Sequence, residues 1–301
     1  MFIPNRDSLN VSVIDASTFA KITTLTGFVN GQPRNVAIDS VNNRLWVANN
    51  TNSNNGSISV IDASTFASIT TFTGVNTPGG MAVDSANNQV WVVNENINDV
   101  TVIDASSFAI ITTITGLLSR PLSVAIDPVN NRAWVVNTSG NNVSVIDAST
   151  FVKITTISIT APLGAAIDVA NNRGWVCSVA TASVIDASTF AKITTLTGFT
   201  SSGATRIGMA VDSTNNQVWI PNNSVSGNVS VINASTYTRV TTITGITAPW
   251  SLAVNSANNQ VWVPSATTSQ VSVIDASTFA KVTTIAVGSG AVDVAINPPS
   301  L

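Results

Sequence analysis

The sequence repeats itself about every 43 residues, and this repeat constrains the fold more than any other feature. A first string, VIDAST or a close variant, occurs seven times and has its acid or amide at Asp15, Asp62, Asp104, Asp147, Asp186, Asn233 and Asp275. A second string, VAID followed by NN, has its acid or amide at Asp39, Asp84, Asp127, Asp168, Asp212, Asn255 and Asn297. Successive members of the second series are 41 to 45 residues apart. This spacing is typical of one four-stranded blade of a β-propeller.

Each repeat contains four short runs rich in valine, isoleucine and threonine, separated by turn residues. In the repeat that begins at Pro121 the runs are Val124–Asp127, Ala133–Asn137, Val143–Asp147 and Val152–Ile157. Short β-branched runs bounded by Asn, Asp, Gly and Ser predict strands, and no stretch shows a sustained helical period. Seven such repeats predict an all-β fold: a seven-bladed β-propeller with four-stranded blades, formed as a single domain by residues 1–301.

The two ends of the chain complement each other. The last repeat stops after Val294–Asn297, which reads as a first strand with no second, third or fourth strand after it. The chain opens with Phe2–Asn5, which matches the second strand Trp219–Asn222. We therefore predict a closing blade that takes three strands from the N-terminus and one from the C-terminus, which removes the exposed edges of a linear array.

The composition argues against several classes of function. Only 9% of the residues are charged, against about a quarter in an ordinary soluble domain, and there is no histidine. Catalytic triads and metal or haem sites that use imidazole are thereby excluded, and a single cysteine excludes an intramolecular disulfide and CxxC chemistry. The net charge of −3 offers no basic surface for nucleic acid. We expect neither a metal nor a cofactor.

Most of the recurring polar and aromatic residues are interpreted as scaffold. Eleven of the fifteen acids occupy the two repeated turn positions, where a short side chain can accept backbone hydrogen bonds. Asparagine replaces aspartate at three of these positions, so an acceptor is required and not a charge. One aromatic residue per repeat is predicted to fill the space between neighbouring sheets: Trp46, Trp91, Trp134, Trp175, Trp219 and Trp262, with Phe2 in the closing blade. Cys177 is predicted to be a small buried apolar residue.

The charges outside the repeat indicate where a site could lie. In an antiparallel blade, the loops from second to third strand and from fourth strand to the next blade share one face, here called the variable-loop face because these loops differ between repeats. The non-repeated charges fall in these loops or at the start of a first strand: Arg6, Asp7, Arg34, Glu95, Asp99, Arg120, Arg206 and Asp293. Trp250, the one tryptophan outside the repeat, lies there as well.

From this set we predict a ligand-binding group near the mouth of the central channel, formed by Arg34, Arg120, Arg206, Trp250 and Asp293. Arginine suits carboxylate, sulfate or phosphate groups, and an exposed tryptophan suits a sugar face or an apolar patch of a partner. The alternative interpretation is that these are ordinary solvated loop residues.

The repeat resembles that of the YVTN-type propellers of archaeal and bacterial surface-layer and other cell-surface proteins. The motif appears as Trp46-Val47-Ala48-Asn49, Trp91-Val92-Val93-Asn94, Trp134-Val135-Val136-Asn137 and Trp219-Ile220-Pro221-Asn222, with tryptophan in place of tyrosine. The resemblance covers essentially the whole chain. It implies the propeller fold and a place on a cell surface, but it implies no particular activity because propellers serve many functions.

We therefore expect a non-enzymatic interaction or structural module that binds a glycan or a protein through its variable-loop face. The expected location is a cell surface, the extracellular space or a virion. No signal peptide and no transmembrane segment are visible, which leaves a cytoplasmic location open. The alternative is a propeller enzyme, similar to the seven-bladed lactonases or lyases, with its site at the mouth of the central channel.

Overall fold

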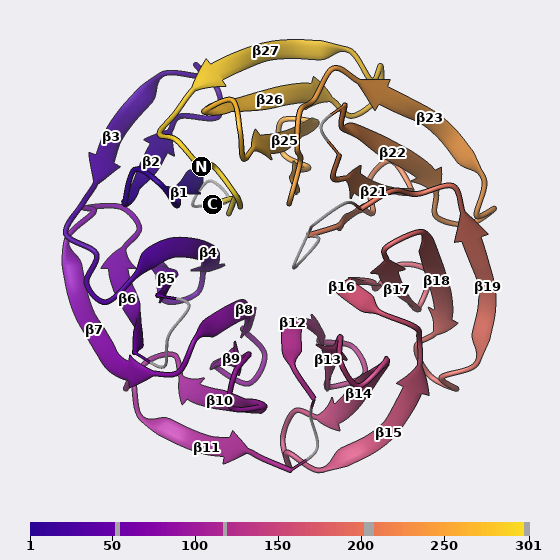
Figure 1. The fold of residues 1–301 in the computed structure, drawn as a ribbon, viewed down its shortest axis with the longest axis horizontal. Helices are drawn as coiled ribbons and strands as arrows, with labels where there is room; N and C mark the ends of the chain where they lie inside the picture. The colour runs from indigo at the N-terminus through magenta and orange to yellow at the C-terminus, as the bar shows by residue number, and fades with distance from the viewer. Residues whose placement is uncertain (52–54, 117–118, 202–207, 225, 298–301) are drawn as a thin grey trace.

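The computed structural model describes residues 1–51, 55–116, 119–201, 208–224 and 226–297. Within these ranges all the regular secondary structure is β-strand, and the strands form seven antiparallel sheets around a common centre (Figure 1). Six sheets have four strands that follow one another in chain order, and the seventh has three. The predicted all-β, seven-bladed propeller is confirmed.

The six four-stranded sheets are called the first to sixth blades, and each runs from the centre of the ring to its rim in chain order (Figure 1). The first blade consists of β4 (Gln32–Asp39), β5 (Arg44–Asn50), β6 (Gly56–Asp62) and β7 (Ser68–Val75). The second consists of β8 (Pro78–Asp84), β9 (Gln89–Asn94), β10 (Asp99–Asp104) and β11 (Ile110–Ile114). The third consists of β12 (Pro121–Asp127), β13 (Arg132–Asn137), β14 (Asn142–Asp147) and β15 (Lys153–Ser158).

The next three blades follow the same plan. The fourth consists of β16 (Pro162–Asp168), β17 (Arg173–Ser178), β18 (Thr181–Asp186) and β19 (Lys192–Thr197). The fifth consists of β20 (Ala210–Asp212), β21 (Gln217–Asn222), β22 (Asn228–Asn233) and β23 (Arg239–Thr244). The sixth consists of β24 (Ala253–Asn255), β25 (Gln260–Ser265), β26 (Gln270–Asp275) and β27 (Lys281–Ala286).

The closing blade joins both ends of the chain, as predicted. Its three strands are β1 (Phe2–Asn5), β2 (Asn10–Ile14) and β3 (Lys21–Leu25). The C-terminal segment lies antiparallel to β1: the N–H of Phe2 donates to the carbonyl of Ala295 at 2.9 Å, and the N–H of Ala295 donates back to Phe2 at 3.0 Å. Figure 1 shows β1 on the inner side of the ring.

The repeated aspartates end the strands in the way the sequence predicts. Oδ1 of Asp15 accepts hydrogen bonds from the backbone N–H groups of Ser17 and Thr18, both at 2.8 Å. Oδ1 of Asp39 accepts from the N–H of Asn42 at 3.0 Å, and its Oδ2 accepts from the side-chain amide of Asn42 at 2.7 Å. Because these bonds satisfy backbone donors that the strands leave open, the carboxylates are part of the scaffold.

The tryptophans fill the space between the blades, as predicted. All six of the repeat tryptophans have 0% exposure. Each contacts the aromatic residue that follows the VIDAST turn of the next blade, and Phe2 contacts Phe66 in the same way, with ring centroids 5.9 to 6.2 Å apart. The aromatic residue after the VIDAST turn has a positive φ of 61° to 66° in every blade: Phe19, Phe66, Phe108, Phe151, Phe190, Tyr237 and Phe279. This costly conformation is maintained because it directs the ring into the neighbouring blade.

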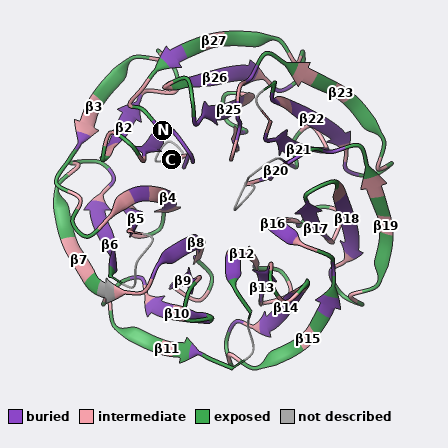
Figure 2. Cartoon of the chain, viewed as in Figure 1, coloured by how far each residue is buried: buried purple, intermediate pink, exposed green. Residues whose placement is uncertain are grey.

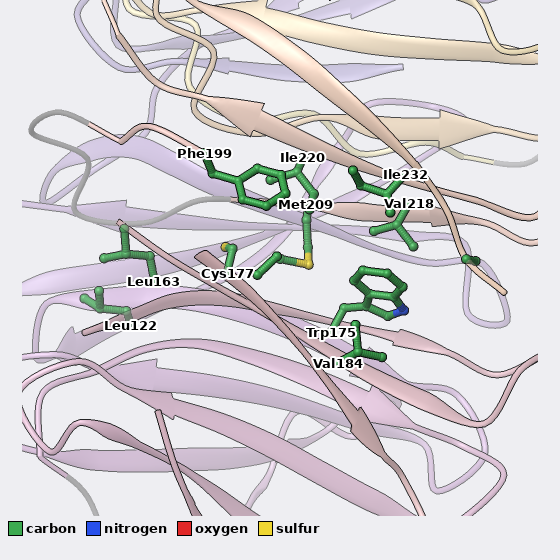
Figure 3. Packing of buried hydrophobic residues seen from close by; sticks show 12 residues of the cluster. Leu122, Leu163, Trp175, Cys177, Val184, Phe199, Met209, Val218, Ile220 and Ile232 are labelled. Atoms are coloured by element: carbon green, nitrogen blue, oxygen red, sulfur yellow. The ribbon is translucent and has the colours of Figure 1, made fainter. Parts of the chain in front are cut away.

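Burial decreases from the inner blade strands to the rim (Figure 2). The outer strands are largely exposed, whereas the apolar residues of the second and third strands form clusters between adjacent blades. Figure 3 shows one such cluster, where Cys177 lies among Trp175, Leu163 and Met209. Cys177 is 1% exposed, and this burial raises the pKa of its thiol to about 12. The thiol is therefore neutral and enclosed, which agrees with the predicted apolar role.

Candidate functional site

A small depression, here called the central depression, lies on the variable-loop face beside the inner strands β4 and β8. Its lining comes from the first, second, sixth and closing blades: Arg34, Asn50, Pro78, Gly79, Glu95, Trp250 and Val292. The enclosed space is about 20 Å³, which is enough for about one water molecule. Side chains of four consecutive blades therefore meet here and form a contoured polar and aromatic surface.

Arg6 and Asp7 extend this surface from the loop between β1 and β2. The Nε of Arg6 lies 2.8 Å from Oδ1 of Asp7, and its guanidinium carbon lies 5.3 Å from the ring centroid of Trp250. The hydrogen bond from Arg6, together with the positive charges of Arg6 and Arg34, lowers the pKa of Asp7. Asp7 is thus ionised at neutral pH and orients the arginine that covers Trp250.

Arg34 and Glu95 contribute charge from the first and second blades. The Nη2 of Arg34 donates to Oε1 of Gln32 at 3.1 Å. Glu95 follows the last residue of β9 and lies over Gly79: a Cβ added to this glycine would come within 2.9 Å of Oε1 of Glu95. The glycine therefore leaves room for the carboxylate at the edge of the depression. We call Arg6, Asp7, Arg34, Glu95 and Trp250 the central cluster.

The five residues predicted from the sequence do not all lie at one place in the structure. Arg34 and Trp250 line the same depression. Arg120 is exposed in the loop before β12 and is not among the residues that line the depression. Arg206 lies outside the described residues. Arg6, Asp7 and Glu95 were not in the predicted group, although each of them had the signal that identified it, a charge outside the repeat.

Asp293 lies beneath this surface and is only 7% exposed. Its Oδ2 accepts hydrogen bonds from the side-chain amide of Asn35 and from the N–H of Val36, the latter at 3.1 Å. Oδ1 of Asn35 in turn accepts from the N–H of Met81 at 2.7 Å. Asp293 therefore links the closing blade to the inner strands of the first and second blades. A sequence signal existed, because most other blades have Gly or Ser at the position of Asp293 and Asn35.

Two features are absent from the described part of the chain. No group of three or more cysteine, aspartate or glutamate side chains is arranged to hold a metal ion there. In the same ranges of the chain, no helix is long and apolar enough to cross a membrane.

Solved structures with the same fold define the class of protein, a seven-bladed β-propeller. A functionally unknown protein from Desulfotomaculum acetoxidans has a TM-score of 0.81 at 13% identity, covering 99% of both chains. A Lactobacillus plantarum protein has a TM-score of 0.77 at 14% identity over 97% of both chains. Hydrazine synthase of Kuenenia stuttgartiensis has a TM-score of 0.75 at 14% identity, over 93% of this chain and 92% of that one. At these identities the likeness shows the fold alone.

No protein-family model and no curated protein matches the sequence. The resemblance to the YVTN-type repeat therefore gains support at the level of the propeller, and the particular repeat family has no matching model.

Proposed function

We propose that this chain is a non-enzymatic interaction module that binds a glycan or a protein partner through the central cluster of the variable-loop face. One observation carries the proposal: arginine, carboxylate and tryptophan side chains from four blades meet around one shallow depression. A packed surface of this kind offers hydrogen-bond donors, acceptors and an aromatic ring to a partner, as binding surfaces do.

The location that agrees with this role is a cell surface or a virion, where a rigid ring can present loops to a partner. The likeness of the repeat to surface propellers supports this part of the proposal. Fractionation of the native host, with an antibody against the chain, tests it. Recovery of the protein only in the cytosol would exclude both locations.

Binding is best tested with a glycan array and with pull-down from envelope extracts. We expect Trp250→Ala and Arg34→Gln to weaken capture at least tenfold, because the first removes the aromatic surface and the second removes a guanidinium fork. Lys153→Gln, on the exposed rim strand β15, is the matched control and should leave capture unchanged. Capture that is identical in all of these proteins would refute the role of the central cluster. Retention on the array identifies a glycan, and capture from extracts alone identifies a protein.

A further inference from the structure

A second cavity, of about 340 Å³, lies between the first and second blades and shares no lining residue with the central depression. Its lining residues come mainly from β6 and β7 of the first blade and from β9, β10 and β11 of the second, and these two blades are neighbours in Figure 1. It opens on the variable-loop face, because its lining includes Asn76 of the loop between β7 and β8 and Ile97 of the loop between β9 and β10. A volume of this size holds a small organic molecule.

Most of the cavity wall is apolar and already fixed in position. Ile58 and Ile103 are buried in the facing blades, with exposures of 0% and 2%. Phe72 lies against Trp46, with ring centroids 6.1 Å apart and planes only 12° from parallel. The other apolar residues of the wall are Val75, Ile97 and Ile110. The wall is therefore suited to the hydrocarbon part of a ligand.

An amide and a carboxylate side chain lie together in this wall. The side-chain amide nitrogen of Asn94 donates to Oδ1 of Asp99 at 2.6 Å and to Oγ1 of Thr101 at 2.9 Å. These bonds use both amide hydrogens, and Oδ1 of Asn94 is buried without a donor in the described part of the chain, as are the equivalent atoms of Asn5, Asn49 and Asn137. Oδ1 of Asp99 accepts from Asn94, whereas its Oδ2 is not among the fully buried atoms. Asn94 is 2% exposed and Asp99 is 7% exposed, so water reaches them poorly.

The charge of Asp99 has no role in the blade itself. At the same position of other blades, Asn10, Asn142 and Asn228 accept the equivalent hydrogen bond at 2.7, 2.8 and 2.6 Å. An amide thus completes the turn, and Asp99 adds a negative charge to it. Among the described residues that line the cavity there is no lysine or arginine. Burial accordingly raises the pKa of Asp99.

We propose that this cavity binds a small organic cation, a primary ammonium group on an apolar body. The ammonium group donates to Oδ2 of Asp99, and the apolar body lies against Phe72, Val75 and Ile110. A buried carboxylate without a cation is unfavourable, so a cationic ligand gains from neutralising it. The pairing of the charge with an apolar wall also selects against anions and against strongly hydrated metal ions.

Titration calorimetry at pH 7 with n-hexylammonium, n-hexanol and hexanoate tests the proposal. The three probes have the same chain length, so they differ mainly in the group presented to Asp99. We expect n-hexylammonium to bind at least tenfold more tightly than n-hexanol, and hexanoate to bind most weakly. Equal affinity for the ammonium and the alcohol overturns the proposal.

Asp99→Asn is the decisive variant, because asparagine occupies this position in three other blades and the variant is expected to fold. It should reduce the affinity for n-hexylammonium at least tenfold and leave the affinity for n-hexanol unchanged. Asn142→Asp places a carboxylate at the same position of the third blade and serves as the matched control, since it should neither add nor remove ammonium binding. An Asp99→Asn protein with the wild-type preference for ammonium also overturns the proposal.

Discussion

At the scale of single residues, the blades use two ways to stabilise their tryptophans. In the second, fifth and sixth blades a glutamine two residues before the tryptophan accepts the indole N–H, at 3.0 to 3.1 Å. In the first, third and fourth blades an arginine stands there, and the indole nitrogens of Trp46, Trp134 and Trp175 have no partner among the described residues. These arginines instead reach the next blade, where Arg132 lies 4.7 Å from the ring centroid of Phe190. In these three blades the indole N–H has no hydrogen bond, and the arginine instead stabilises the contact with the next blade.

This exchange predicts different results for two substitutions of Arg132. Arg132→Ala removes the contact with Phe190 and the hydrogen bond to the carbonyl of Ala187, and should cost about 1–2 kcal/mol of unfolding free energy. Arg132→Gln should cost about 0.5 kcal/mol, because the glutamine can accept the N–H of Trp134 as Gln89 does for Trp91. Urea denaturation measures both, and equal destabilisation would show that the arginine contact alone matters.

Trp250 differs from the other tryptophans in being only partly buried, which makes it a reporter for the central cluster. Acrylamide should quench a small accessible fraction of the tryptophan fluorescence of the native protein, and Trp250→Phe should abolish that fraction, because the six repeat tryptophans have 0% exposure. Arg6→Gln should enlarge it by uncovering the ring. Unchanged quenching in Trp250→Phe would place the accessible tryptophan elsewhere.

At the scale of the strand and its turn, the VIDAST aspartates act through backbone hydrogen bonds. Backbone donation from Thr150 is the largest cause that lowers the pKa of Asp147, and five equivalent aspartates shift in the same direction. Asn233 makes the same two bonds without a charge, at 3.0 and 2.8 Å. The turn thus requires the oxygen, whereas the charge makes the stability depend on pH.

The sign of this dependence follows from the lowered pKa. The folded state holds its proton less tightly than the unfolded chain, whose aspartates titrate near pH ~3.9. The stabilisation is therefore complete above that pH and is lost as the pH falls through the folded pKa values. Asp147→Asn should make the stability less dependent on pH below ~4 and should cost up to about 1 kcal/mol at pH 7, because hydrogen bonds to a neutral oxygen are weaker than those to a carboxylate. Asp147→Ala should cost about 1–2 kcal/mol at pH 7, since two N–H donors lose their acceptor. Thermal melts at pH 7 and pH 3 measure both.

The same scale explains which features were predictable from the sequence. A blade element is repeated seven times, so the strands, the Asp turns and the buried tryptophans could be assigned from their spacing. The contact of Arg6 with Trp250 joins loops of the closing and sixth blades that share no sequence pattern, so it depends on how these loops lie across the ring. The cavity beside Asp99 likewise depends on side chains of two blades. Its one indication in the sequence is the charge of Asp99, at a position where the other blades have Asn or another uncharged residue.

At the scale of the whole molecule, the side-chain hydrogen bonds between neighbouring blades differ from junction to junction. At the five junctions from the first to the sixth blade, the first asparagine of the NN turn donates to the second asparagine of the next blade, at 2.7 to 3.2 Å. In the described structure this bond is missing at both junctions of the closing blade, and Asn258 donates there to the carbonyl of Ala16 at 3.4 Å. The hydrogen bonds of Asp293 to the first blade are therefore expected to contribute more to the closure of the ring than any single bond at the other junctions.

Removing that link should open the ring locally before it unfolds. Asp293→Ala leaves the buried N–H of Val36 and the amide of Asn35 without this acceptor, which we expect to cost about 3 kcal/mol because both bonds go to a charged group. Native-state hydrogen exchange should show faster exchange at Val36, Met81 and β1, while the third and fourth blades keep their protection. Ser123→Ala, at the equivalent position of the third blade, is the control and should change none of these rates. Uniformly faster exchange in all blades would show that the seven blades open only together, and that the junction between the closing and first blades does not open before the others.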